Sequence, residues 1–186
     1  MGAYCVIVHF GKYLDLSFEE AYNNMFSSLI YVLNQTYNLK TKILVEMTAG
    51  QGTETGYNID GVSRLFNKFK LIKDTKIINR IGICMDTCHA FASGYNLKKI
   101  DIIKKFFKEF NSKIKLENLK LIHLNDSKVE LGKKKDRHEN LGKGFIGMEG
   151  LHYIYKISKK YKIPIVLETP NKGYKTEINK LLNFKI

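Results

Sequence analysis

Five short apolar runs recur along the chain, and apolar and polar positions do not alternate within them. The runs are AYCVIV (3–8), KILVEM (42–47), RIGICMD (80–86), LKLIHLN (119–125) and IPIVLE (163–168). Nearly continuous runs of Val, Ile and Leu are typical of strands that are buried on both faces, as in parallel sheets. The pattern therefore predicts five parallel strands.

Apolar residues with helical spacing fill the segments between these runs. They cover residues 18–33, 62–72, 100–110 and 146–161, and we expect a final helix at 175–184. Ser17, with Glu20 three residues later, predicts a capped helix start, and Asp60 predicts another. Alternating strands and helices form βα units around a parallel sheet. Since no linker or low-complexity tract interrupts them, we expect residues 1–186 to form a single domain.

Each predicted strand ends in a side chain that can bind a metal ion. The five ends carry His9, Glu46, Asp86, His123 and Glu168. The carboxyl ends of parallel strands face one common side, so these side chains should meet there. A single histidine at a strand end is more often structural, but so many carboxylates and imidazoles are costly to bury together without cations. Mixed His, Asp and Glu ligands favour Zn²⁺, with Mn²⁺ or Fe²⁺ as other occupants, and the set is large enough for two or three ions.

The segment HLNDSKVELGKKKDRHENLGKG (123–144) adds further candidates. Side chains alternate along an extended backbone, so Asp136 and His138 should point the same way and Arg137 away from them, or toward an anionic ligand. Together with His89, they form a candidate His/Asp/His site. Asn125 either orients metal ligands through hydrogen bonds or caps the loop, and the same two roles are open for Asp126.

The charge balance favours a polyanionic partner. The chain has 31 basic and 18 acidic residues, a formal net charge of +13. Such an excess favours nucleic acid ahead of an anionic membrane surface. Multi-metal sites often hydrolyse phosphate esters, so a polymeric phosphodiester is the substrate class that fits both observations.

The three cysteines and the absence of long apolar stretches indicate the compartment. Cys5 and Cys84 lie inside apolar runs, and the three cysteines do not form a disulfide framework, so we expect buried free thiols. No stretch is apolar enough to span a membrane, and the N-terminus lacks the features of a secretory leader. We therefore expect a soluble intracellular protein, in the cytoplasm or nucleus and not secreted.

Four sequence blocks resemble the signature blocks of the endonuclease IV family. They are VEMTAGQG (45–52), GICMDTCHAFASGY (82–95), the 123–144 segment quoted above and VLETP (166–170). This family comprises zinc-dependent apurinic/apyrimidinic endonucleases with a TIM-barrel (β/α)8 fold, and the resemblance covers almost the full chain. It implies a base-excision-repair enzyme that cleaves double-stranded DNA on the 5′ side of an abasic site, with a metal-bound hydroxide as nucleophile. It also implies that the abasic sugar is flipped out of the duplex.

The resemblance also implies roles for individual residues. Glu46 should bridge two zinc ions. The ligand sets are His9 and Glu46 for the first ion, Glu46, Asp86, His123 and Glu168 for the second, and His89, Asp136 and His138 for the third. The candidate DNA contacts are Gln51, Lys133, Lys134, Lys135 and Arg137.

One departure from the family concerns the N-terminal side. The chain has five βα units, which correspond to the last five of the family's eight strands, so we expect an incomplete barrel. The first metal then lacks a further histidine ligand. The runs at 3–8 and 163–168 should form open edges, which an N-terminal segment encoded elsewhere or self-association would cover. We expect this chain alone to be marginally stable and weakly active.

Two other functions remain open from the sequence. The first is a sugar isomerase-like TIM barrel with two divalent metals, although the basic loop and the positive charge argue against a neutral sugar substrate. The second is an inactive remnant that binds DNA. Every remaining ligand position carries a residue type that can bind a metal, which argues against loss of the enzyme's function. The absence of the N-terminal strands argues for such a loss.

Overall fold

The five apolar runs form one parallel sheet in the computed structural model, which describes residues 2–170 and 173–184. The strand order is β1 (Cys5–His9), β2 (Lys42–Glu46), β3 (Ile81–Asp86), β4 (Leu119–His123) and β7 (Ile165–Val166). All five predicted strands are present. The last is shorter than predicted, with two residues paired to β4.

The predicted helices are also present and follow the strands in chain order. They are α1 (Phe18–Gln35), α2 (Ile59–Phe69), α5 (Ile100–Lys113), α6 (Met148–Tyr161) and α7 (Tyr174–Asn183). Elements that were not predicted are α3 (Thr75–Ile78), α4 (Thr87–Ser93), the 3₁₀ turn η1 (Leu116–Asn118) and the short hairpin of β5 (Asp126–Ser127) and β6 (His138–Glu139). None of the helices in the described residues has both the length and the apolar character needed to cross a bilayer.

One of the two predicted helix caps is confirmed. Ser17 and Glu20 form the expected capping box at the start of α1. The predicted cap at Asp60 is wrong, because Asn58 caps α2 and accepts a hydrogen bond from the Gly61 N–H at 2.8 Å. Asp60 instead lies in the first turn, where its negative charge suits the positive end of the helix dipole.

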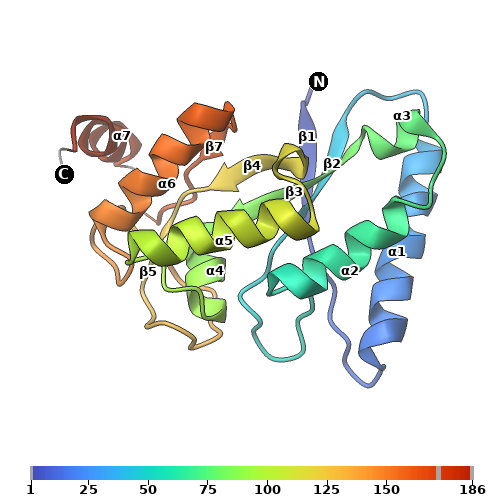
Figure 1. Cartoon of the computed structure of the whole chain (residues 1–186), viewed down its shortest axis with the longest axis horizontal. Coiled ribbons are helices and arrows are strands. Elements are labelled where there is room, and N and C mark those ends of the chain that lie inside the picture. The colour runs from blue at the N-terminus through green and yellow to red at the C-terminus, as the bar shows by residue number, and fades with distance from the viewer. Residues whose placement is uncertain (1, 171–172, 185–186) are drawn as a thin grey trace.

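The two faces of the sheet have different partners. Helices α1, α2, α5 and α6 pack against the outer face and follow one another across Figure 1, and this interface holds the main hydrophobic core. The inner face carries a smaller apolar cluster of Cys5, Ile7, Leu44, Cys84 and Leu121, here called the inner layer. Because side chains alternate along a strand, the residue two positions after an inner-layer residue shares its face. On the first four strands that residue is His9, Glu46, Asp86 or His123.

Both edges of the sheet are open, which agrees with the predicted incomplete barrel. Each of β1 and β7 pairs with only one neighbour within residues 2–170 and 173–184. The edge residues Val6 and Val166 are 52% and 44% exposed. An apolar groove of about 350 Å³ follows the β1 edge, and one of about 470 Å³ follows the β7 edge.

The cysteines are free thiols, as predicted. Cys84 and Cys88 are buried. Cys5 is only half-buried, because it lies on the edge strand β1.

Candidate metal centre

The first four strands bring their terminal side chains together through the register of the sheet. His9 pairs with Glu46 across β1 and β2, and Asp86 pairs with His123 across β3 and β4. Partners in a parallel register lie side by side, so their side chains share one face. His9 Nε2 accordingly lies 3.3 Å from Glu46 Oε2. The sheet topology therefore places four of the predicted ligands together, at the end of the sheet where the strands have their carboxyl ends.

The fifth strand completes a group of carboxylates around His123. His123 Nδ1 lies 2.9 Å from Glu46 Oε1, 2.8 Å from Glu168 Oε2 and 3.9 Å from Asp86 Oδ2. One ligand atom from each of these four residues lies within 4.8 Å of the others. This group has the same members as the second predicted ligand set.

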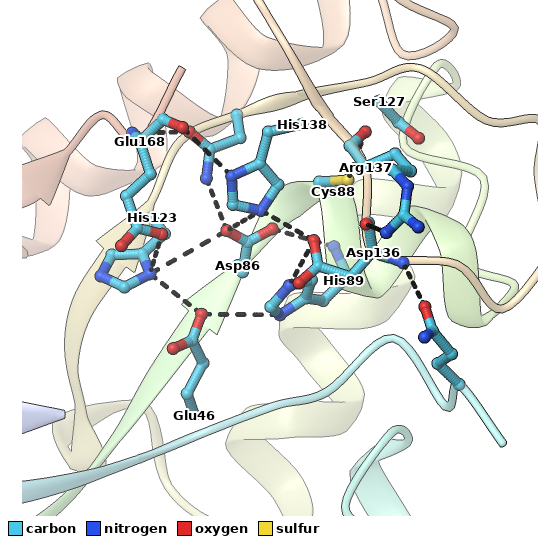
Figure 2. A network of polar contacts seen from close by, with 12 residues as sticks. Glu46, Asp86, Cys88, His89, His123, Ser127, Asp136, Arg137, His138 and Glu168 are labelled. Atoms are coloured by element: carbon cyan, nitrogen blue, oxygen red, sulfur yellow. Dashed lines mark hydrogen bonds and ion pairs between the residues drawn. The ribbon is translucent and has the colours of Figure 1, made fainter. Parts of the chain in front are cut away.

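His89, Asp136 and His138 form the other predicted set. His89 comes from α4, which begins where β3 ends, because Asp86 Oδ1 caps that helix by accepting from the His89 N–H at 2.9 Å. Asp136 Oδ1 lies 3.1 Å from His89 Nε2 and 3.2 Å from His138 Nε2. In Figure 2 the labelled donors face one another around a common space, namely Glu46, Asp86, His89, His123, Asp136, His138 and Glu168.

His89 lies beside the remaining set, which the sequence resemblance did not predict. His9 and Glu46 were expected to hold the first ion alone. His89 also lies beside them, with its Nδ1 3.5 Å from Glu46 Oε1, and the three residues form one candidate group. His89 therefore contacts two groups, with Nδ1 near Glu46 and Nε2 near Asp136.

Backbone carbonyls fix which nitrogen of two histidines is available to a cation. His89 Nδ1 lies 2.9 Å from the Met47 carbonyl, and His138 Nδ1 lies 3.2 Å from the Glu168 carbonyl. A carbonyl only accepts, so each Nδ1 carries the proton and each Nε2 offers a lone pair. Both Nε2 atoms are buried without a hydrogen bond in the described part of the chain, although they face the same Asp136 oxygen. A cation between these donors satisfies both, so the residues fit a metal.

Glu46 is held ionised despite its burial. Burial alone raises the pKa of Glu46, but the imidazoles of His123 and His9 outweigh burial and lower this pKa to about 2. The negative charge that a bridging ligand needs is therefore present at neutral pH.

The same carboxylates make two histidines strong proton acceptors. Burial lowers the pKa of His89, but Asp86, Asp136 and Glu46 raise it to about 10. Burial also lowers the pKa of His138, and Asp136 and Asp86 raise it to about 9. Without a metal, protons balance the carboxylates, so protons and metal ions compete for these donors.

Asn125 orients two of the donors, which is one of the two roles that the sequence left open. Its side-chain N–H donates to Asp86 Oδ2 at 2.6 Å, and its side-chain oxygen accepts from the Glu168 N–H at 2.8 Å. Asn125 is completely buried. It thereby fixes the positions of carboxylates that come from different strands.

We expect Asn125→Ala to weaken metal binding about 10- to 100-fold, the usual effect of removing a group that orients metal ligands. Competition for zinc against a chromophoric chelator measures the change. Asn67→Ala, at an exposed position of α2, is the matched control and should leave the affinity unchanged. Equal affinities for the two variants would show that Asn125 does not position the ligands.

Asp126 has the other role, because it organises the loop that carries His138. Its buried carboxylate accepts from the backbone N–H groups of Gly142 and Gly144, both at 3.0 Å. A Cβ atom at Gly144 would overlap the Ser127 carbonyl, so only glycine allows this approach. The folded loop pairs Ser127 with His138 in the antiparallel hairpin.

The candidate DNA contacts lie around the cluster. Gln51 Oε1 accepts from the Asp136 N–H at 3.3 Å, which gives Gln51 a structural role at the rim. Arg137 is exposed and points away from the donors, as alternation predicted (Figure 2). Lys133, Lys134 and Lys135 are all exposed on the same loop. Lys134 Nζ also lies 5.0 Å from the centre of the Tyr57 ring.

Comparison with known proteins identifies relatives of the whole chain. A model of the family described as "Xylose isomerase-like TIM barrel" matches residues 1–184. A probable endonuclease 4 of Mycoplasma mobile is 40% identical over 169 residues, which are 91% of this chain and 56% of the relative. A probable endonuclease 4 of Mycoplasmopsis synoviae is 41% identical over 184 residues, which are 97% of this chain and 62% of the relative.

A solved structure is similar to this chain over the same part of its length. Endonuclease IV from Thermus thermophilus superposes with a TM-score of 0.75 at 27% identity, over 97% of this chain and 61% of that one. The chain therefore spans less than two thirds of the length of these relatives.

Proposed function

Because the chain belongs to the xylose isomerase-like TIM barrel family and its resemblance to endonuclease IV is confirmed, we propose that it is a zinc-dependent DNA-repair endonuclease. It hydrolyses the phosphodiester on the 5′ side of an abasic site in double-stranded DNA, and leaves a 3′-hydroxyl and a 5′-deoxyribose phosphate. The observation that carries the proposal is the convergence of carboxylate and imidazole donors from the five strand ends, from helix α4 and from one loop.

The donor groups support up to three zinc ions. His9 and Glu46 would hold one ion, and Glu46, Asp86, His123 and Glu168 would hold another. His89 through its Nε2, Asp136 and His138 would hold the third. When bound, zinc ions act as Lewis acids on the phosphate and lower the pKa of coordinated water. Glu46 belongs to both of the first two sets, so it is the side chain that would be shared between them.

The surrounding residues are proposed to hold the DNA. Lys133, Lys134, Lys135 and Arg137 form an exposed basic stretch on the loop that also carries the third donor set. Cationic side chains bind the phosphate backbone without reading sequence. This suits an enzyme that recognises a missing base. It does not suit a sugar isomerase, whose substrate is neutral.

Incision of a defined duplex tests the proposal. A labelled duplex with a single abasic site is mixed with an excess of zinc-loaded protein, so that even a slow single turnover is detected. We expect zinc-dependent incision on the 5′ side of the site, abolished by a chelator and absent from the same duplex without the lesion. Binding without incision would instead support an inactive DNA-binding remnant, and interconversion of aldose and ketose sugars would support the isomerase.

The third donor set should affect turnover more than DNA affinity. His138→Ala removes a nitrogen that faces Asp136, so we expect one zinc ion fewer per chain and incision reduced about a hundredfold. Binding of the abasic duplex should change only a few-fold. Arg137→Ala is the contrasting variant, because its exposed side chain should affect affinity and not turnover. Equal losses of binding and turnover in His138→Ala would mean that the loop only docks DNA.

The lysine cluster should act through salt-dependent affinity. Replacing Lys133, Lys134 and Lys135 by Gln should weaken DNA binding and reduce the slope of log affinity against log salt by about 0.9 for each phosphate that the loop no longer neutralises. The matched control replaces Lys104, Lys105 and Lys108, which are exposed on α5. An identical salt slope for the two triple variants would exclude phosphate binding by the loop.

A further inference from the structure

Cys84 lies beside the carboxylate that connects the metal groups. The parallel register pairs Cys84 of β3 with Glu46 of β2. The Cys84 sulfur, a Glu46 carboxylate oxygen and a His123 ring nitrogen lie within 4.8 Å of one another. All three side chains are buried, so the strands hold a preformed set of one sulfur, one oxygen and one nitrogen donor.

Packing alone does not distinguish Cys84 from its neighbours. It is completely buried with Leu44 and Leu121 in the inner layer, where a thiol can serve as a small apolar side chain. Cys5 belongs to the same layer, yet it joins no candidate donor group among the described residues. Cys84 pairs with Glu46 in the strand register and lies two residues before Asp86 on the same face, so its sulfur is beside the carboxylates as well as in the inner layer.

Cys88 is a weaker candidate. It forms a possible group with Asp86 and His138, but its thiol already donates to the Arg137 carbonyl at 3.4 Å. That contact gives Cys88 a structural role in holding the loop.

We propose that Cys84, Glu46 and His123 form a binding site for thiophilic divalent cations, with Cd²⁺ as the model ion. Sulfur ligands select soft ions, whereas the carboxylate and imidazole groups suit zinc. The thiol proton passes to solvent as the metal–sulfur bond forms, and no oxidation state changes. Because Glu46 and His123 also belong to zinc groups, a soft ion bound here displaces zinc and blocks the proposed enzyme.

Cadmium titration of the metal-free chain tests the site directly. A cadmium–thiolate bond gives an ultraviolet charge-transfer absorption that zinc, carboxylates and imidazoles do not give. The chain has three cysteines, so the double variant Cys5→Ser/Cys88→Ser leaves Cys84 as the only thiol. We expect this variant to show the absorption, saturating at one thiolate-bound Cd²⁺ per chain, with release of bound zinc when the protein is zinc-loaded.

Variants that lack Cys84 provide the complementary test of the cadmium site. Cys84→Ser and Cys84→Ala should lose this absorption and bind Cd²⁺ at least about tenfold more weakly, and Cys5→Ser should behave as the unchanged chain. The alanine variant keeps an apolar side chain in the inner layer, and circular dichroism verifies its fold. Absence of the absorption from the folded Cys84-only chain, or its persistence in both Cys84 variants, would overturn the proposal. The readout needs neither DNA nor incision, so its failure and that of the proposed nuclease activity are distinguishable.

Discussion

The Glu46→Gln variant should lose zinc and incise abasic DNA at least about a thousandfold more slowly. Glu46 faces His9, His89 and His123 and belongs to two of the proposed zinc sets, so no other side chain supplies its charge to both. Loss of metal at such a site removes several kcal/mol of transition-state stabilisation, and each 1.4 kcal/mol corresponds to about tenfold in rate. Zinc per chain and single-turnover incision measure the two effects.

The shape of the Glu46 side chain is preserved in glutamine, so the comparison isolates its charge. Glu117→Gln is the matched control, because Glu117 is an exposed carboxylate in η1, which precedes β4 and so lies at the opposite end of that strand from His123. It should keep both zinc and activity. Normal zinc content together with normal incision in Glu46→Gln would contradict the assignment of Glu46 as the bridging ligand.

The metal-free chain should lose stability as the pH rises from about 6.5 to about 10. The pKa values of His89 and His138 are raised from 6.5 to about 10 and about 9 in the folded chain. A histidine whose pKa is raised on folding stabilises the fold fully at pH values below its unfolded-state pKa. This stabilisation is lost as the pH rises through its folded-state pKa. The expected loss is a few kcal/mol, since one unit of pKa shift corresponds to about 1.4 kcal/mol. Denaturant unfolding across this pH range measures it.

At acidic pH the stability of the metal-free chain should change in the opposite direction and fall as the pH falls. The pKa of Glu46 is lowered from 4.5 to about 2, so its contribution is present above pH 4.5 and is lost as the pH falls toward 2. Zinc replaces the protons at the histidines, so a zinc-loaded chain should remain stable into the alkaline range. A saturating ligand at a hundred times its dissociation constant adds about 2.7 kcal/mol. A metal-free chain whose stability is flat between pH 6.5 and 10 would show that these histidines are not coupled to the carboxylates.

The sequence predicted the strands because each is a nearly continuous apolar run. The inner strands β2, β3 and β4 are buried on both faces, whereas the edge strands β1 and β7 are partly exposed. The sequence also predicted the meeting of the donors, since parallel strands place His9, Glu46, Asp86 and His123 at one end of the sheet by topology alone. Family resemblance contributed the division of the donors into sets.

Other features depend on contacts that a sequence does not display. The seven-residue helix α4 is too short for a periodic pattern, and its cap, Asp86, is also the last residue of β3. Because of α4, His89 lies next to Glu46 as well as Asp136, and its place in two groups was not predicted. The separate roles of Asn125 and Asp126 become visible only when residues 39 to 43 and 16 to 21 positions away fold against them.

Anomalous diffraction at the zinc absorption edge, from crystals grown with zinc, shows whether zinc binds among the clustered carboxylates and imidazoles. We expect a peak bounded by His89, Asp136 and His138, and further density against Glu46 within the two proposed zinc sets that contain it. Peaks confined to other parts of the surface, or an empty space among these donors in a zinc-saturated crystal, would contradict this expectation.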